Sequence, residues 1–257
     1  MSSTVYLITG ASRGLGRSSP LSLATSTQAL LASSPSVKVV ATARDPDKAV
    51  ELKALAAKKE NEGRLLVVQL DVSDEKSVET FATEFEKNPF AGNGIDCLVN
   101  NAGCSPGGFT SLHSASTSEL RTVLETNIFG AIWVTKALLP LLRRGQAKQL
   151  VFISSIAGSL GGPVSQVAAC GTYAISKAAL NMAMRKFAAE LALEGFTTVS
   201  YHPGFVDTDM NVGAPETGLT LLSRDEAAEA ALTHLFRKLT PADNSKFLAY
   251  DGTEMPW

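Results

Sequence analysis

The amino-acid sequence predicts an α/β protein, with one domain over residues 1–257 built on a doubly wound parallel sheet of about seven strands. Short β-branched apolar runs recur along the chain, helix-length patterns separate them, and a glycine-rich turn follows the first run directly. Strands this apolar must be buried on both faces, as they are in a parallel sheet that lies between two layers of helices.

The apolar runs and the helical patterns alternate from one end of the chain to the other. The predicted strands are 5–9, 37–42, 65–70, 95–100, 149–154, 197–202 and 246–249. Helices are predicted over about 47–60, 75–87, 118–143, 172–194 and 223–239, with Ser73 and Ser223 as caps before acidic residues. Pro20 and a run of Ser and Thr follow the glycine turn, so the first crossover helix is expected to be irregular or weak.

Composition limits the classes of function that the chain can serve. The 257 residues are 45% hydrophobic and 19% charged, with a formal net charge of -2, which favours a small-molecule partner over nucleic acid or an anionic membrane. Neither a secretory signal nor an apolar stretch of membrane-spanning length is recognised, so a cytoplasmic location is expected. Three scattered cysteines predict neither a disulfide framework nor a metal site; we expect Cys97 in a strand core, and Cys104 and Cys170 as pocket lining.

The segment Tyr173-Ala-Ile-Ser-Lys177 indicates proton-transfer chemistry. A phenol and an amine four residues apart share one helix face, about 6 Å apart along the axis. The ammonium is expected to favour the phenolate and to bring the tyrosine pKa closer to working pH, as general acid–base catalysis requires. Ser155 would donate a second hydrogen bond to the reacting oxygen. Alone, this spacing is usually a surface pair on an amphipathic helix; its context favours hydride transfer to or from a carbonyl.

The glycine turn predicts a dinucleotide site. Gly10, Gly14 and Gly16 follow the first run and open a helix, so the backbone can approach a pyrophosphate and the helix N-terminus can donate N–H groups. Their spacing, Gly-x-x-x-Gly-x-Gly, differs from the Gly-x-Gly-x-x-Gly of the longer dehydrogenases.

Two arginines favour NADP(H) as the cofactor. Arg44 ends the second run and Arg13 lies inside the glycine turn, where their guanidinium groups could bind a 2′-phosphate. Asp45 keeps an alternative open, because its carboxylate could accept the ribose hydroxyls of NAD. It could equally begin the next helix together with Pro46 and Asp47.

One polar residue interrupts an apolar helical stripe. Asn127 lies on a stripe with Leu120, Val123, Leu124, Ile128 and Ala131. A buried amide needs hydrogen-bond partners, so Asn127 is either a satisfied core group or a member of a proton relay. The presence of Tyr173 favours the relay.

Taken in order, these residues resemble the short-chain dehydrogenase/reductase family from residue 4 onward. The matching motifs are Thr9-Gly-x-x-x-Gly-x-Gly16, Asp71-Val72, Asn100-Asn101-Ala102-Gly103, Asn127, Ser155, Tyr173-x-x-x-Lys177 and Pro203-Gly204-x-Val206-x-Thr208. The resemblance implies a Rossmann-type fold and a catalytic tetrad of Asn127, Ser155, Tyr173 and Lys177.

The resemblance also implies a role for individual cofactor residues. Lys177 would hold the nicotinamide ribose, Asn127 would anchor a relay water, and Asp71 would contact the adenine. Without the family, Asp71 is as readily a strand-end cap, and Asn100-Asn101 a strand-ending turn. The full set of implied cofactor-binding residues is Gly10, Ser12, Arg13, Gly14, Leu15, Gly16, Arg44, Asp71, Val72, Asn100, Ala102, Gly103, Tyr173, Lys177, Pro203, Gly204, Val206 and Thr208.

The interval between Ser155 and Tyr173 is longer than the family's commonest one, and the excess falls in 161–171. This loop should border the pocket. Together with both ends of the chain, it resembles the sniffer-like, C-factor-like and norsolorinic acid ketoreductase-type branch of carbonyl reductases. The resemblance implies NADPH-dependent reduction of a ketone or aldehyde. An NAD-dependent alcohol dehydrogenase and a non-catalytic nucleotide-binding signalling protein remain as alternatives.

Two further expectations concern partners. Segment 209–222 carries few charges and predicts an apolar or aromatic substrate, although it could also be a lid that packs on itself. The helices at 118–143 and 172–194 commonly pair in dimers of the family, so a homo-oligomer is possible, and the insertion could obstruct it.

Overall fold

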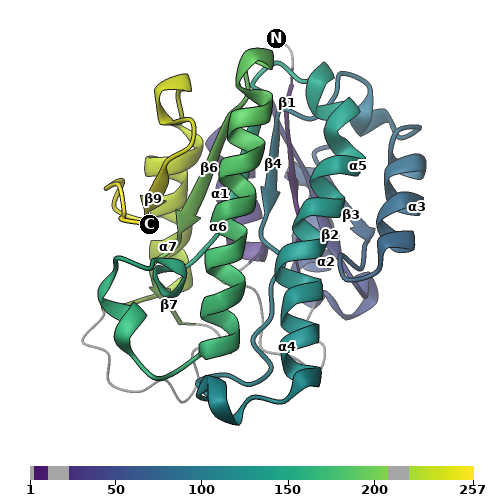
Figure 1. Ribbon diagram of the computed structural model, residues 1–257. Coiled ribbons are helices and arrows are strands. Elements are labelled where there is room, and N and C mark those ends of the chain that lie inside the picture. Colours follow the sequence, from purple (N-terminus) through teal and green to yellow (C-terminus); the bar gives the residue numbers. More distant parts are fainter. Residues whose placement is uncertain (1–2, 11–22, 208–219) are drawn as a thin grey trace.

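A seven-stranded parallel sheet lies between two layers of helices in the computed structural model, which describes residues 3–10, 23–207 and 220–257 (Figure 1). Its strand order is β3-β2-β1-β4-β5-β6-β9, and every neighbouring pair is parallel. The predicted doubly wound sheet is therefore confirmed. The strands are β1 (Thr4–Ile8), β2 (Val37–Ala43), β3 (Leu65–Gln69), β4 (Cys97–Asn100), β5 (Gln149–Ile153), β6 (Thr197–His202) and β9 (Phe247–Ala249).

Each face of the sheet forms its own hydrophobic core, because successive strand side chains point to opposite faces. In β1, Tyr6 and Ile8 belong to one core, and Val5 and Leu7 belong to the other. Figure 1 shows α5 and α6 in front of the sheet and α1 behind it. The first core is covered by α1 (Leu23–Ser33), α2 (Val50–Ala56) and α7 (Arg224–Ala231), and the second by α3 (Glu75–Phe85), α5 (Gly130–Arg144) and α6 (Gly171–Leu191).

The helix predicted over 47–60 is wrong in extent. Pro46–Lys48 is a 3₁₀ turn, α2 covers only Val50–Ala56, and Lys59–Asn61 is a second 3₁₀ turn. Ala49 separates the first turn from α2, because its φ of -82° and ψ of 62° lie outside the helical region. A helical sequence pattern does not reveal such an interruption.

The two predicted caps have different outcomes. Ser223 caps α7, because its side chain accepts from Glu226 N while Glu226 reaches back to Ser223 N. Ser73 was the wrong residue for α3, since Asp74 accepts from Lys76 N and so caps that helix. The Ser73 hydroxyl instead donates to Asp71.

The helix predicted over 118–143 is continuous but not uniform. It consists of α4 (Thr117–Leu124), a π-helical turn (Glu125–Phe129) and α5. Asn127 lies in the π turn, a local widening of the helix that often marks a functional site.

Some expectations fall outside the part of the chain that the structure describes. They concern Ser12, Arg13, Gly14, Leu15, Gly16, Thr208, the stretch around Pro20 and most of segment 209–222. Among the described helices, none combines the length and the hydropathy needed to cross a bilayer.

The carboxyl ends of the parallel strands meet at one edge of the sheet, where α/β proteins bind ligands. Gly10 follows β1, Arg44 follows β2, and Ser154 follows β5 at this edge. Near it, β7 (Phe205–Val206) pairs with β8 (Leu221–Leu222). Gly204 makes the approach possible: its φ is +89°, and a Cβ there would lie 2.5 Å from Leu222.

Candidate active site

Tyr173 and Lys177 form a buried pair at the start of α6. Tyr173 is 8% exposed and Lys177 is 1% exposed. The ammonium nitrogen of Lys177 lies 5.4 Å from the centroid of the Tyr173 ring and donates to the Ile153 carbonyl at 2.7 Å. Tyr173 and Lys177 therefore share one helix face, as predicted. The alternative, that they form a pair on the surface of an amphipathic helix, is wrong because both side chains are buried.

Ser155 follows β5 and faces the same pair. Its hydroxyl oxygen accepts from Ala157 N at 3.2 Å and caps a short 3₁₀ turn, Ile156–Gly158. Its hydroxyl also hydrogen-bonds Tyr173. The adjacent Ser154 is fully buried and donates to Asn181 Oδ1, so Ser155 is the serine that faces the phenol.

Burial controls the protonation of this cluster. It raises the pKa of the Tyr173 phenol; the Ser155 hydrogen bond lowers that pKa, whereas Cys170 and Cys104 raise it further. Burial also lowers the pKa of Lys177 from 10.5 to about 7, against a smaller opposite effect of Cys104. The expected net lowering of the tyrosine pKa by Lys177 is wrong, because the loss of hydration at this buried phenol outweighs the other effects.

The two shifts nevertheless suit a proton relay. The phenol keeps its proton at neutral pH and can act as an acid, whereas the amine exchanges its proton close to pH 7. A group that titrates near the working pH is well placed to take part in proton transfer. The group whose pKa lies near the working pH is therefore Lys177, whereas the sequence pattern predicted this for Tyr173.

Asn127 joins the loop after β4 to α6. Its Oδ1 accepts from Cys104 N at 2.8 Å, and its Nδ2 donates to the Cys104 carbonyl and to Ser176 Oγ at 2.9 Å. Ser176 in turn donates to the Tyr173 carbonyl. The amide, which is 1% exposed, is thus satisfied and is linked to the helix that carries Tyr173.

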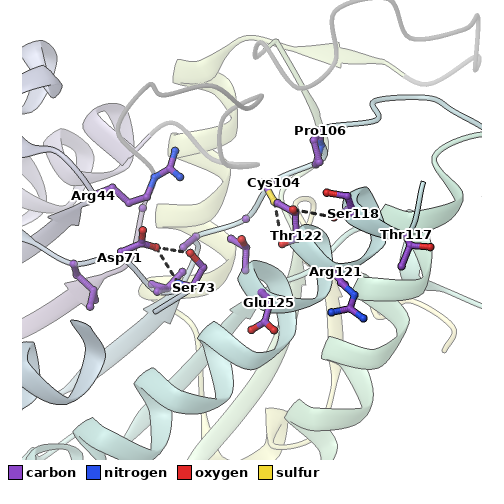
Figure 2. Close-up of a pocket in the computed structure, with 16 residues that line it drawn as sticks. Arg44, Asp71, Ser73, Cys104, Pro106, Thr117, Ser118, Arg121, Thr122 and Glu125 are labelled. Atoms are coloured by element: carbon purple, nitrogen blue, oxygen red, sulfur yellow. Dashed lines mark hydrogen bonds between the residues drawn. The ribbon is translucent and has the colours of Figure 1, made fainter. Parts of the chain in front are cut away.

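A cavity of about 700 Å³ lies beside this cluster, at the ends of β1 to β4 (Figure 2). Figure 2 shows Arg44 and Asp71 on one side of it and Cys104 on another. The predicted pocket position of Cys104 is confirmed. Among the predicted cofactor residues that the structure describes, six line the cavity: Gly10, Arg44, Asp71, Val72, Ala102 and Gly103.

Other described residues of the predicted set do not line that cavity. Asn100, Ser155, Tyr173 and Lys177 do not line it, and neither do Pro203, Gly204 and Val206, which follow β6. The candidate site therefore has two parts, a cavity at the Arg44 end and a buried cluster around Tyr173.

Arg44 and Asp45 differ in their surroundings. Arg44 is exposed and lines the cavity. The Asp45 carboxylate accepts from the backbone N–H groups of Asp47 and Lys48 and forms an ion pair with Lys48 at 2.7 Å. The Lys48 hydrogen bond also lowers the pKa of Asp45. Asp45 thus starts the next turn, as one of the sequence interpretations had it.

Two buried asparagines lead from β4 into the loop that lines the cavity through Ala102, Gly103 and Cys104. Within the described ranges, Asn100 Oδ1 and both side-chain polar atoms of Asn101 are buried without a hydrogen-bond partner. Thr9 Oγ1 accepts from Asn101 N and Ala102 N and so ties the end of β1 to the loop after β4. Unpaired buried amides are uncommon in native proteins.

The sequence interpretation missed one wall of the cavity. Polar residues of α4 and of the following π turn form it together with Ser73 and Pro106. Their signal was present in the sequence, since they recur at helical spacing on the face opposite the apolar stripe. They are Thr117, Ser118, Arg121, Thr122, Glu125 and Thr126.

The insertion at 161–171 is attached at both ends. Gly161 N donates to the Trp257 carbonyl at 2.7 Å, and Gly171 N donates to the Thr110 carbonyl at 3.3 Å. Cys170, at its end, has a φ of 49° and precedes α6. No insertion residue lines the described cavity, so its position beside a substrate pocket remains a prediction.

The three cysteines are free thiols. Cys97 is buried in β4, as predicted for a strand core. Burial raises the pKa of both Cys104 and Cys170, so neither thiol is favoured as a thiolate at neutral pH. Among the residues that the structure describes, no group of three His, Cys, Asp or Glu side chains is placed to hold a metal.

Comparison with known proteins identifies the family. The family model described as short chain dehydrogenase matches residues 4–218, so the chain belongs to the short-chain dehydrogenase family of oxidoreductases. An uncharacterized oxidoreductase of Schizosaccharomyces pombe is 35% identical over 98% of this chain and 98% of its own.

Two solved structures share both the fold and part of the sequence. The NADPH-bound carbonyl reductase from chicken fatty liver is 31% identical with a TM-score of 0.85, and carbonyl reductase Sniffer of D. melanogaster is 28% identical with a TM-score of 0.83. Each alignment covers 100% of both chains. The family and the carbonyl reductase branch inferred from the sequence are confirmed.

Proposed function

We propose that this chain is a carbonyl reductase that uses NADPH to reduce a ketone or an aldehyde. The observation that carries the proposal is the buried pair of Tyr173 and Lys177, 5.4 Å from nitrogen to ring centroid, with Ser155 hydrogen-bonded to the phenol. A protonated phenol, a second hydroxyl donor and an amine that titrates near neutrality are the groups that reduction of a carbonyl requires.

The chain's own residues would supply the proton and the orientation. Bound NADPH would provide the hydride to the carbonyl carbon. Ser155 would hold the carbonyl oxygen by a hydrogen bond, and Tyr173 would give that oxygen a proton as negative charge develops on it. Lys177, whose ammonium points at the phenol ring, would stabilise the phenolate that remains. Asn127 would hold α6 and the loop after β4 in place relative to each other, through its hydrogen bonds to Ser176 and Cys104.

The cavity at the Arg44 end supports NADP(H) as the cofactor. Arg44 places a cation at the rim, where a 2′-phosphate would lie, whereas the Asp45 carboxylate is engaged by Lys48. Asp71 and Val72 would contact the adenine, and Gly10, Ala102 and Gly103 would lie against the rest of the cofactor. We propose the remaining roles, including those of Ser12, Arg13, Gly14, Leu15, Gly16, Asn100, Pro203, Gly204, Val206 and Thr208, on the family resemblance.

Cofactor titration and turnover test the proposal together. Nicotinamide fluorescence gives the dissociation constants of NADPH and NADH without a known substrate. We expect NADPH to bind about tenfold more tightly, or roughly 1.4 kcal/mol. A panel of ketones and aldehydes that includes isatin, an aromatic dicarbonyl compound, then tests reduction.

The outcome also decides between the proposed function and the two alternatives. Tighter binding of NADH would favour an NAD-dependent alcohol dehydrogenase. Tight NADPH binding with no reduction of any carbonyl, and cellular activity that survives Tyr173→Phe, would favour a nucleotide-binding signalling protein.

We further propose one dinucleotide-binding and catalytic domain over 1–257, an apolar or aromatic substrate and a cytoplasmic reaction. The exposed side chains of Leu160 and Val167, in and beside the insertion, support an apolar substrate. Analytical ultracentrifugation with and without NADPH tests whether the chain forms a homo-oligomer.

A further inference from the structure

Asn181 holds both ends of the turn that carries Ser155. Its Oδ1 accepts from Ser154 Oγ at 2.6 Å, and its Nδ2 donates to the Gly158 carbonyl at 3.2 Å. The amide is 4% exposed and lies on α6, four residues after Lys177. One side chain thus connects the residues directly before and three positions after Ser155 to the helix of Tyr173 and Lys177.

The partners of Asn181 fix which way its amide points. The Gly158 carbonyl can only accept a hydrogen bond, so the amide must present its NH₂ group there. Its carbonyl oxygen then faces Ser154, whose hydroxyl must be the donor. This arrangement needs one donor and one acceptor in the same planar group, which an ionised aspartate cannot provide.

The turn also packs tightly on α6. Gly158 N donates to the Ser155 carbonyl at 2.9 Å and closes the turn. A Cβ on Gly158 would lie 2.7 Å from the Lys177 carbonyl carbon. At Gly158 the turn therefore lies directly against the backbone of α6, the helix that carries Tyr173 and Asn181.

We propose that Asn181 is a positioning residue that acts through Ser155. It keeps the serine hydroxyl at hydrogen-bonding distance from the Tyr173 phenol and therefore from the carbonyl oxygen that both residues would hold. The inference rests on the proposed reductase function. Displacement of a positioned group by about 1 Å can cost about a hundredfold in rate, so loss of this amide is expected to reduce kcat rather than cofactor binding.

A double-mutant cycle tests whether Asn181 acts through Ser155. In the wild-type background, Asn181→Ala should lower kcat for isatin reduction by about 10- to 100-fold and leave the NADPH dissociation constant within about twofold. In a Ser155→Ala background, the same substitution should cost less than about threefold, because the group that it positions is already gone. Equal losses in both backgrounds, or no loss in the wild type, would overturn the proposal.

Two further variants separate the chemistry of the amide from its volume. Asn181→Asp keeps the shape but turns a carboxylate toward the Gly158 carbonyl, so kcat should fall at least as far as in Asn181→Ala. Ser154→Ala removes one of the two bonds and should give an intermediate loss. A variant that stays fully active at a pH where the new carboxyl group is ionised would contradict the assignment of donor and acceptor.

Asn61→Ala is the matched control. Asn61 is also 4% exposed, and its Nδ2 donates to the Leu55 carbonyl at 2.8 Å, far along the chain from the Ser155 turn. Its loss should affect stability but leave kcat unchanged in both backgrounds. A kcat loss of similar size in Asn61→Ala would mean that general destabilisation explains the effect of Asn181.

Amide hydrogen exchange tests, independently of turnover, whether Asn181 holds the turn that carries Ser155. Asn181→Ala should accelerate exchange at Gly158 and Ser159, whose N–H groups bond to Ser155 and Ile156, and Asn61→Ala should not. If exchange at Gly158 and Ser159 is unchanged in Asn181→Ala, Asn181 does not hold the turn. If wild-type protein reduces no carbonyl compound, the proposed function fails, and exchange alone then decides whether Asn181 holds the turn.

Discussion

The cavity beside Arg44 and the cluster around Tyr173 lie at the same edge of the sheet, but they differ in burial and in hydrogen bonding. Arg44, Thr117, Ser118 and Arg121 are exposed at the cavity. In the cluster, Tyr173, Lys177 and Asn127 are buried and Ser155 is half-buried, and their polar groups bond one another or the backbone. Changes at the cavity should therefore weaken binding moderately, whereas changes in the cluster should abolish chemistry.

Tyr173→Phe should have the largest effect. It removes the proton donor but keeps the ring, and positioned acid–base groups contribute about 10²- to 10⁴-fold to the rate. We expect kcat to fall within that range while the NADPH dissociation constant stays close to that of the wild type. Steady-state reduction of isatin and fluorescence titration measure the two quantities. A variant that retains most of its turnover would remove Tyr173 from the mechanism.

Lys177 should give the reaction its pH dependence. Its pKa of about 7 leaves the ammonium charged below pH 7 and neutral above it. Because the charged form stabilises a phenolate, kcat/KM for reduction should be higher on the acid side and fall through an inflection near pH 7. In Lys177→Met this inflection should disappear. A wild-type profile that is flat from about pH 6 to 8 would contradict the assignment.

Lys177 should also couple stability to pH. Between pH 7 and 10.5 the unfolded chain holds a proton on Lys177 that the folded chain has released, so this residue makes the free energy of unfolding rise with pH. Urea unfolding of wild type and Lys177→Met at pH 7 and about pH 9 measures the difference. The wild type should gain more stability than the variant over this interval, and an equal change in both proteins would show that the pKa is not lowered.

Arg44→Ala should have a smaller, cofactor-specific effect. It removes an exposed cation at the cavity and should weaken NADPH binding by about tenfold, or roughly 1.4 kcal/mol. NADH binding should change little, because NADH lacks the 2′-phosphate. Equal weakening of both cofactors would show that Arg44 supports the fold of the cavity rather than the phosphate.

Asp45→Ala is the matched control for Arg44 and should have the smallest effect. The Asp45 carboxylate is bonded to Lys48 and to two backbone N–H groups, so it is not needed for the ribose. Both cofactors should bind Asp45→Ala within about twofold of the wild type. A specific loss of NADH binding would assign Asp45 to the ribose hydroxyls after all.

The same two regions show what the sequence could predict. The strand runs were recognisable because parallel strands are buried on both faces and read as continuous apolar segments. Tyr173, Lys177 and Asn127 were recognisable because a helix places residues three or four positions apart on one face. Periodicity thus revealed which side chains share a face.

Periodicity could not show how deeply a group is buried. The predicted direction of the Tyr173 pKa shift was wrong, because the shift is set by burial, and burial depends on the strands and loops around α6. The helix over 47–60 was too long because the backbone at Ala49 leaves the helical region. The α4 wall of the cavity was missed because its polar face could equally have been solvated surface. Burial and the position of a cavity depend on segments distant in sequence, and the conformation at Ala49 leaves no mark in the helical pattern.

Deuterium transfer from NADPH labelled at the transferable position tests the central claim most directly. Wild-type protein is incubated with isatin, and the carbinol product is examined by mass spectrometry and NMR. If the chain reduces carbonyls as proposed, deuterium appears on the carbinol carbon, with a yield that collapses in Tyr173→Phe although the labelled cofactor still binds. A product without deuterium, or equal yields from the two proteins, would contradict the account.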